Sequence, residues 1–349
     1  MYSQKVIISD QLDQTLTAAV AECPHDLVFV LADQTTATCC VPLVRALPCL
    51  QSAQLVVIGA TDTHKNLESL SHVWQALSEG GATRHTLLIN IGGGMVTDLG
   101  GFAASTFKRG IPYINIPTTL LSMVDASVGG KTGINFLGLK NEIGVFNNAS
   151  SVILDTQFLK TLDQANLLSG YAEMLKHGLI SDDAMLAELL TFDIEQPDFT
   201  VLKRLVADSV AVKQRIVTED PTEKGLRKAL NLGHTAGHAF ESFALQREPV
   251  LHGYAVAWGL IVELYLSTVK TGFPTERLRQ TTRFIQDHYG KLTITCDDYP
   301  TLLELMTHDK KNTAGQINFT LLGGVGDIRI DQTATKEEIC EAFDFYREG

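Results

Sequence analysis

Three histidines in the second half of the chain form the set of side chains best suited to bind a metal. His234 and His238 are four residues apart and therefore share a helix face, and His252 follows after a short connection. Neutral imidazoles with a carboxylate are a common ligand set for zinc, and three protein ligands leave one coordination position open for chemistry. Spacing does not decide which carboxylate completes the set. Glu241 lies on a neighbouring helix face, and Glu173 lies in a separate helix-like segment. The stretch therefore predicts a catalytic metal site.

A run of three glycines lies between an apolar segment and a helix-compatible one. Residues 92–94 directly follow the strand-like run 87–91, and the helix-compatible segment begins at Met95. Glycines allow backbone N–H groups to approach a phosphate closely, and a helix N-terminus adds partial positive charge. The run is not the G-x-G-x-x-G fingerprint, because position 97 is Thr. It indicates a nucleotide or phosphate site, and a tight structural turn is the alternative.

The second glycine-rich segment, 124–133, contains Gly-Gly-Lys-Thr but is not a Walker A motif. That motif needs a glycine five positions before its Gly-Lys pair, and Asp125 stands there. We expect a flexible loop that carries Asp125 and Lys131, followed by Lys140 and Asn141. Their charges either belong to a site or are simply solvated.

Two halves with different patterns must position these residues. Up to about residue 156, short β-branched runs alternate with helical stretches, which is typical of a parallel sheet covered on both faces. Strands are expected at 27–31, 54–58, 86–91, 113–116 and 151–154, with a helix at 66–79. Helix-period segments then follow at 183–192, 201–217, 228–245 and 253–270, with strand signals only at 316–322 and 327–330. We expect an α/β domain with a Rossmann-like parallel sheet over 1–158 and a mostly α-helical domain over 159–349.

Composition excludes several classes of protein. The 349 residues include 28 Lys+Arg and 40 Asp+Glu, a net charge of −12, which disfavours a nucleic-acid binder. An anionic substrate must therefore be met by a local cluster of Lys and Arg. The six cysteines form no CxxC pair, which argues against a zinc ribbon or disulfide scaffold. The first residues resemble no secretory signal, and the most apolar stretch, 254–269, is too short for a bilayer span, so we expect a cytoplasmic protein without a membrane partner.

Several blocks of the sequence resemble the 3-dehydroquinate synthase family in order and spacing. They are residues 92–98, 109–112, 117–121, 124–135, 140–141, 170–176 and 230–241 with His252, and the likeness extends from about residue 26 to residue 322. The resemblance implies an N-terminal α/β nucleotide-binding domain, a helical metal- and substrate-binding domain, and a homodimer. It also implies NAD and one divalent metal, usually zinc, with cobalt as the alternative.

The same resemblance implies an activity. Its substrate is 3-deoxy-D-arabino-heptulosonate 7-phosphate and its products are 3-dehydroquinate and phosphate, in the shikimate pathway of aromatic amino acid biosynthesis. The steps are a transient NAD-dependent oxidation, phosphate elimination, re-reduction and an intramolecular aldol closure.

Carried over motif by motif, the family's functional residues fall on defined positions of this chain. The implied metal ligands are Glu173, His234 and His252, which leaves His238 outside the first ligand sphere as a proton-handling residue. The implied NAD contacts are Asp33, Asp62, Lys65, Gly93, Gly94, Asp98, Thr118, Thr119, Asp125, Lys140, Phe158 and Thr161. The implied substrate and catalytic contacts are Arg109, Lys131, Asn141, Lys176, Lys213, Arg227, Asn231, His238 and Lys310. The cations among them satisfy the requirement set by the net charge.

The sequence departs from the family pattern at Asp62, where Glu is usual, at Thr35, where Asn is usual, and in the segment 163–166. Asp163, Ala165 and Asn166 stand where the family usually has a Pro and an Arg-Glu pair, at the edge of the cofactor site.

Three other functions are alternatives to the one that the resemblance implies. The nearest is that of another sugar-phosphate cyclase, of the 2-epi-5-epi-valiolone or 2-deoxy-scyllo-inosose synthase type, whose substrate lacks the carboxylate. A metal-dependent polyol dehydrogenase would share the triple-glycine turn but would not need Lys131. The third is a non-catalytic NAD-binding protein.

Overall fold

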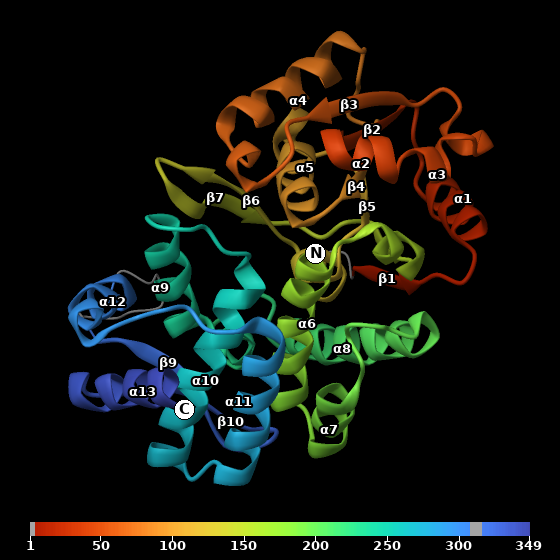
Figure 1. Ribbon diagram of the computed structural model, residues 1–349. Coiled ribbons are helices and arrows are strands. Elements are labelled where there is room, and N and C mark those ends of the chain that lie inside the picture. The colour runs from red at the N-terminus through yellow and green to blue at the C-terminus, as the bar shows by residue number, and fades with distance from the viewer. Residues whose placement is uncertain (1–3, 308–315) are drawn as a thin grey trace. The chain divides into compact units, whose positions relative to one another are not determined.

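The computed structural model describes residues 4–307 and 316–349 and divides into two compact units, Met1–Asp163 and Gln164–Gly349 (Figure 1). The boundary expected at residue 158 falls inside a short helix, η5 (Thr156–Thr161). Each unit has its own hydrophobic core and is described by itself.

The first unit is built on a six-stranded parallel sheet. Its strands are, in spatial order, β1 (Lys5–Ile8), β8 (Ser151–Leu154), β5 (Tyr113–Pro117), β4 (Leu87–Gly92), β2 (Val28–Asp33) and β3 (Gln54–Ile58). Every residue of the four central strands is buried, as expected for a sheet covered on both faces. This confirms the predicted α/β class and all five predicted strands of this sheet; its sixth strand, β1, was not predicted.

The strand order creates a switch point between β2 and β4. The chain runs from β2 to β3 on one side and then returns to place β4 on the other side of β2. Ligands of open α/β sheets bind at such a point, beyond the carboxyl ends of the strands. Those ends are Asp33 and Gly92, so the triple-glycine turn lies where a nucleotide is expected.

Helices connect the strands of the first unit. They are α1 (Leu12–Glu22), α2 (Gln34–Cys39), α3 (Pro42–Arg45), α4 (Leu67–Glu79) and α5 (Gly94–Thr106), with the short helices η1 (Pro48–Leu50), η2 (Asp62–His64), η3 (Phe107–Arg109), η4 (Ser122–Ala126) and η5. The predicted helix 66–79 is confirmed as α4, which buries Leu70, Val73 and Leu77 on one face.

The expectation of a flexible loop that carries Asp125 and Lys131 and leads to Lys140 and Asn141 is wrong, because Asp125 lies in the short helix η4 and regular strands follow it. Residues there form an antiparallel hairpin of β6 (Lys131–Phe136) and β7 (Leu139–Phe146). Leu137 and Gly138 both have positive φ, 49° and 82°, as a two-residue hairpin turn requires. Gly133 and Gly144 pair across the hairpin, and a Cβ on Gly144 would lie 2.1 Å from the carbonyl oxygen of Thr132. These glycines allow close pairing but hide the strand pattern in the sequence.

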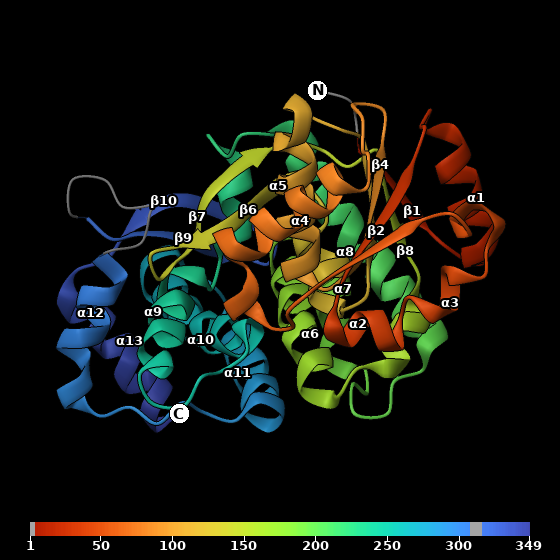
Figure 2. The ribbon, with the colours of Figure 1, turned by 90° about the horizontal axis from the view of Figure 1, so that it is seen from above.

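The second unit is mainly helical (Figure 2). Its helices are α6 (Gln164–Leu179), α7 (Asp183–Thr191), α8 (Phe199–Glu219), α9 (His234–Leu245), α10 (His252–Thr271), α11 (Thr275–Tyr289), α12 (Tyr299–Thr307) and α13 (Lys336–Glu348), with η6 (Leu226–Asn231), η7 (Cys296–Asp298) and the antiparallel pair β9 (Asn318–Gly324) and β10 (Asp327–Thr333). α10 packs against α6, α9, α11 and α13 and is apolar on nearly every side, as a central helix must be. No helix in the described part of the chain is long and apolar enough to cross a membrane.

The helix expected over 228–245 is broken. Residues 226–231 form η6, and α9 begins only at His234. Gly233 between them has a left-handed φ of 79°, and a Cβ there would lie 2.7 Å from Cδ2 of Leu260. The left-handed φ favours glycine at this position, which separates the first helix from the second.

Candidate functional site

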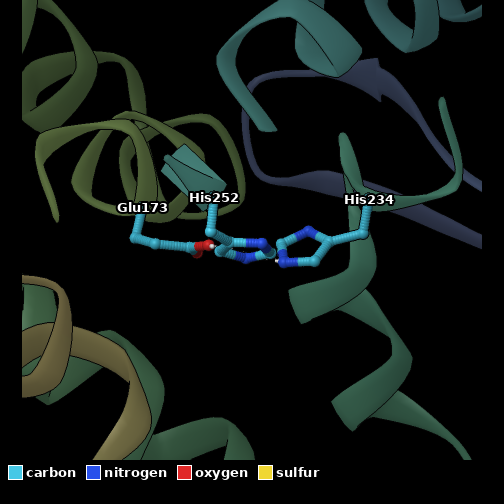
Figure 3. A group of neighbouring side chains, drawn as sticks. All are labelled: Glu173, His234 and His252. Atoms are coloured by element: carbon cyan, nitrogen blue, oxygen red, sulfur yellow. Dashed lines mark ion pairs between the residues drawn. The ribbon is translucent and has the colours of Figure 1, made fainter. Parts of the chain in front are cut away.

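Three side chains of the second unit converge on one point (Figure 3). Glu173 comes from the middle of α6, while His234 and His252 are the first residues of α9 and α10. The Nε2 atoms of His234 and His252 lie 3.4 and 3.6 Å from Oε1 of Glu173. The structure therefore brings together the three residues that the family resemblance implies as metal ligands.

The chemistry of this cluster fits a divalent cation. Lys176 pairs with Oε2 of Glu173, but Oε1 is buried and accepts no hydrogen bond among the described residues, which is costly unless another group binds it. One atom from each of the three side chains lies within 4.8 Å of the other two. One carboxylate oxygen and two imidazole nitrogens are a protein ligand set of catalytic zinc centres, in which water or substrate takes the fourth position.

Two of the three groups carry the charge state that metal binding requires. Burial alone would raise the pKa of Glu173, but Lys176 and His234 hold it well below its usual range. Burial lowers the pKa of His234 to about 4, so this imidazole is neutral at physiological pH. An ionised carboxylate and a neutral imidazole are the ligand forms of these side chains.

The Nδ1 atom of each imidazole has its own partner. Nδ1 of His234 lies 3.1 Å from the carbonyl oxygen of Leu232, and Nδ1 of His252 lies 3.2 Å from Oε2 of Glu241. Such contacts fix the ring and leave Nε2 for the metal. Glu241, one of the two carboxylates that spacing left open, therefore lies behind His252, and Glu173 is the carboxylate within the cluster.

His238 lies beside the cluster. Its ring centroid is 5.3 Å from that of His234 and 5.9 Å from that of His252. It is not part of the three-residue group whose ligand atoms converge. Its predicted role in handling protons stays a prediction.

Buried cations are the second feature of this unit. Lys176 is 1% exposed and forms an ion pair with Glu173 one helical turn earlier. Lys213 on α8 and Arg227 on η6 are also buried, and Nη1 of Arg227 donates to the carbonyl oxygen of Pro221 at 2.6 Å. Asn231, at the end of η6, donates to Glu223 at 3.0 Å. Lys310, a predicted substrate residue, lies outside the described residues.

The first unit holds the residues expected to bind NAD. α5 starts at Gly94 directly after β4, and its N-cap, Gly93, supplies no capping side chain. Its N-terminal N–H groups and partial positive charge are suited to a phosphate. Asp33 is the last residue of β2, and Thr118 and Thr119 follow β5 at the same edge of the sheet. Asp33 also accepts hydrogen bonds from the backbone of α2, which it caps.

A polar network ties several of the predicted cofactor residues together. Nζ of Lys65 lies 2.6 Å from Oδ2 of Asp98 and also donates to Asn141. Asn135 donates to Asp62 at 3.0 Å and its Oδ1 accepts from the backbone of Asn141 at 2.9 Å. The network links η2, α5 and the β6–β7 hairpin.

The remaining predicted residues of this unit are spread over several elements. Nζ of Lys140 lies 3.8 Å from Oδ2 of Asp62, and Lys131 is exposed at the start of β6. Asp125 is half-buried in η4, and Phe158 and Thr161 lie in η5, where Thr161 donates to the carbonyl oxygen of Phe158 at 2.8 Å.

Arg109 stands apart from the other predicted substrate residues of the first unit. It is exposed, has a left-handed φ of 69°, and lines a depression of about 450 Å³ with Arg84 and Lys108. None of the other predicted site residues lines that depression.

Sequence reasoning missed two carboxylates that hold the backbone of the site. Glu263, on α10, accepts hydrogen bonds from the N–H groups of Gly233 and Ala236 at 2.6 and 3.1 Å. Asp220 accepts from the N–H groups of residues 224, 225 and 227. A signal existed for Glu263, because it is an acidic residue inside an otherwise apolar helix.

Comparison with known proteins gives a consistent result across the chain. Residues 55–169 match the family model of the 3-dehydroquinate synthase N-terminal part, and residues 170–312 match that of its C-terminal part. A 3-dehydroquinate synthase from Parabacteroides distasonis is 55% identical over 350 residues, covering 100% of this chain and 99% of that protein. One from Pyrococcus furiosus is 39% identical, covering 81% of this chain and 82% of that protein.

Solved structures with a similar fold include cyclases and dehydrogenases. A 2-epi-5-epi-valiolone synthase from Streptomyces hygroscopicus subsp. jinggangensis, with NAD+ and Zn2+ bound, has a TM-score of 0.86 at 26% identity, covering 100% of this chain and 98% of that one. A glycerol dehydrogenase from Schizosaccharomyces pombe has a TM-score of 0.70 at 15% identity, covering 99% and 89%, and shares the fold alone.

Proposed function

The chain belongs to the 3-dehydroquinate synthase family, and on that premise we propose that it converts 3-deoxy-D-arabino-heptulosonate 7-phosphate into 3-dehydroquinate and inorganic phosphate. The observation that carries the proposal is the convergence of Glu173, His234 and His252 in the unit that also buries several cations. A metal centre among buried cations suits a substrate that has hydroxyl groups and two anionic ends.

The chain's residues hold two groups in this proposal. Glu173, His234 and His252 hold a divalent cation, zinc or cobalt. NAD is held by the residues Asp33, Asp62, Lys65, Gly93, Gly94, Asp98, Thr118, Thr119, Asp125, Lys140, Phe158 and Thr161. When bound, the cation supplies Lewis-acid polarisation of a substrate hydroxyl, and NAD takes up a hydride and later returns it.

The cationic side chains bind and orient the substrate. Lys176, Lys213 and Arg227 are buried, so their attraction for a carboxylate or phosphate is screened less by water than that of surface lysines. Arg109, Lys131, Lys310, Asn141 and Asn231 complete the proposed set of contacts. One fixed orientation serves every step of the sequence, because each step acts on neighbouring atoms of the same sugar.

Proton transfer is assigned to His238 and to the substrate itself. The elimination removes a proton from the carbon beside the new ketone and breaks the bond to the phosphate oxygen, and the departing phosphate can accept that proton. His238, with its ring 5.3 Å from that of His234, handles protons of the hydroxyl groups. The last step forms the carbon–carbon bond of the ring after the sugar opens.

Phosphate release from matched substrates tests this function. The purified protein, supplied with zinc and NAD, is expected to release phosphate from the heptulosonate phosphate and not from sedoheptulose 7-phosphate, which lacks the carboxylate. Release from sedoheptulose 7-phosphate alone would assign the chain to the other sugar-phosphate cyclases. Oxidation of glycerol 1-phosphate with net formation of NADH would assign it to the polyol dehydrogenases.

A homodimer and a cytoplasmic location belong to the same proposal. The family resemblance supports the dimer, and the absence of a secretory-signal pattern in the first residues supports the location. Sedimentation equilibrium of the purified protein is expected to give about twice the chain mass of 38.1 kDa. A mass equal to that of one chain would contradict the dimer.

A further inference from the structure

The N-terminus of α9 is capped by a residue of another helix. The N-cap of α9 is Gly233, which has no side chain to accept a hydrogen bond from the first turn. Glu263 of α10 supplies the acceptors instead: Oε2 accepts from the N–H of Gly233 at 2.6 Å and Oε1 from the N–H of Ala236 at 3.1 Å. Glu263 is completely buried. A carboxylate that bridges two N–H groups gives stronger hydrogen bonds than a neutral cap.

The two bridged N–H groups lie on either side of His234. Holding residues 233 and 236 together fixes the backbone on which the imidazole stands. The two helices are also in close contact here, because a Cβ on Gly259 would lie 2.0 Å from the carbonyl oxygen of Gly233. Glu263 therefore acts on His234 through a short and rigid connection.

We propose that Glu263 is a positioning residue for the metal centre, which holds Nε2 of His234 in ligand geometry by bridging the backbone N–H groups of Gly233 and Ala236. This inference rests on the proposed function, because it assumes that His234 binds the cation. Groups that orient a metal ligand from behind change metal affinity by roughly 10–100-fold when they are removed. The expected effect of losing Glu263 is a loss of that size.

Zinc affinity of the full-length protein, measured by competition with a chromophoric chelator, tests the proposal. Glu263→Ala removes both acceptors and is expected to weaken zinc binding by roughly 10–100-fold. Glu263→Gln keeps the shape and one acceptor oxygen, and its loss is expected to be smaller. Leu189→Ala is the control, because it truncates a buried side chain in α7, which carries none of the three ligands.

The melting temperature of each zinc-free variant is measured in parallel. If Glu263→Ala and Leu189→Ala lower it equally but only Glu263→Ala loses zinc affinity, Glu263 acts on the metal centre. Equal losses of zinc affinity in both variants would mean general destabilisation and would overturn the proposal. Wild-type affinity in Glu263→Ala would overturn it as well.

His234→Ala distinguishes a failure of this inference from a failure of the proposed function. If His234→Ala loses zinc and Glu263→Ala does not, the metal centre stands and only the positioning role is wrong. If His234→Ala binds zinc like the wild type, the assignment of the metal centre is wrong, and the positioning role proposed for Glu263 is wrong as well.

Discussion

At the scale of single residues, the two imidazoles of the proposed metal centre differ in their surroundings. Nδ1 of His234 contacts a backbone carbonyl oxygen, and burial lowers the pKa of this imidazole to about 4. Nδ1 of His252 contacts the carboxylate of Glu241. Burial alone would lower the pKa of His252, but Glu241 and Glu173 raise it to about 10. Glu241 thus adds a negative charge behind the ligand, which increases its basicity toward a metal.

The first prediction distinguishes a proposed zinc ligand, His252, from a histidine beside the centre, His238. His252→Ala is expected to lose both bound zinc and activity, because one of three ligands is removed. His238→Ala is expected to keep its zinc and lose activity, because it acts on protons. Zinc content after dialysis, measured by atomic emission, checks both variants, with His72→Ala on the exposed face of α4 as the matched control. Loss of zinc from His238→Ala would return that residue to the ligand set.

Only part of the proposed metal centre could be predicted from the sequence. Spacing placed His234 and His238 on one helix face, and the structure does bring their rings together. Spacing could not choose between Glu241 and Glu173, because that choice depends on how α6 packs against α10, which is tertiary information. Family resemblance, not periodicity, pointed to Glu173.

At the scale of elements, the helix pair α9 and α10 depends on glycines at its contact. A Cβ on Gly259 would lie 2.0 Å from the carbonyl oxygen of Gly233 and 2.6 Å from the backbone nitrogen of Gly237. Neither obstacle is a flexible side chain, so the helices would have to separate. His234 and His252, the proposed ligands at the start of the two helices, would then move.

The second prediction follows from this contact. Gly259→Ala is expected to lower the free energy of unfolding by about 1 to 3 kcal/mol through overpacking, and to weaken zinc binding. Urea unfolding and chelator competition measure the two effects. Val269→Ala, at a half-exposed position of the same helix, is the control and is expected to change neither greatly. An unfolding free energy unchanged in Gly259→Ala would contradict the close contact.

The loop between α8 and η6 depends on one carboxylate. Burial alone would raise the pKa of Asp220, but hydrogen bonds from the N–H groups of Gly225, Lys224 and Arg227 lower it to about 2. Because the folded-state pKa is depressed, its contribution to stability is complete above the ordinary value of 3.8 and is lost as the pH falls through about 2.

The third prediction uses this pH dependence. Asp220→Asn is expected to melt at a lower temperature than the wild type near neutral pH, and the difference should shrink as the pH falls from about 4 toward 2. Melting curves at several pH values measure it. Asp208→Asn, which removes an exposed ion pair with Arg204, is the matched control. A melting difference that does not change with pH would show that the carboxylate of Asp220 does not hold the loop.

Element boundaries could be predicted where one physical pattern dominates. The buried parallel strands were found because continuous β-branched runs mark them. The β6–β7 hairpin was missed because Gly133 and Gly144, which its close pairing requires, break that pattern. The break at Gly233 was missed because the apolar periodicity continues across it, although the helical conformation of the backbone does not.

At the scale of the whole molecule, the protein carries an excess of negative charge and buries positive charge locally. The net charge is −12, yet Lys176, Lys213 and Arg227 are all buried in the second unit. The fold does not decide the reaction, because cyclases and dehydrogenases share it. They differ in the fate of NAD: a dehydrogenase releases NADH, whereas the proposed cyclase uses the same NAD for oxidation and reduction.

The most direct measurement follows phosphate release and NADH absorbance together during turnover of 3-deoxy-D-arabino-heptulosonate 7-phosphate by the zinc- and NAD-loaded protein. The expected result is many molecules of phosphate per protein chain, an equal amount of 3-dehydroquinate, and no accumulation of NADH. Formation of NADH in proportion to the substrate consumed, or the absence of phosphate release, would contradict the account.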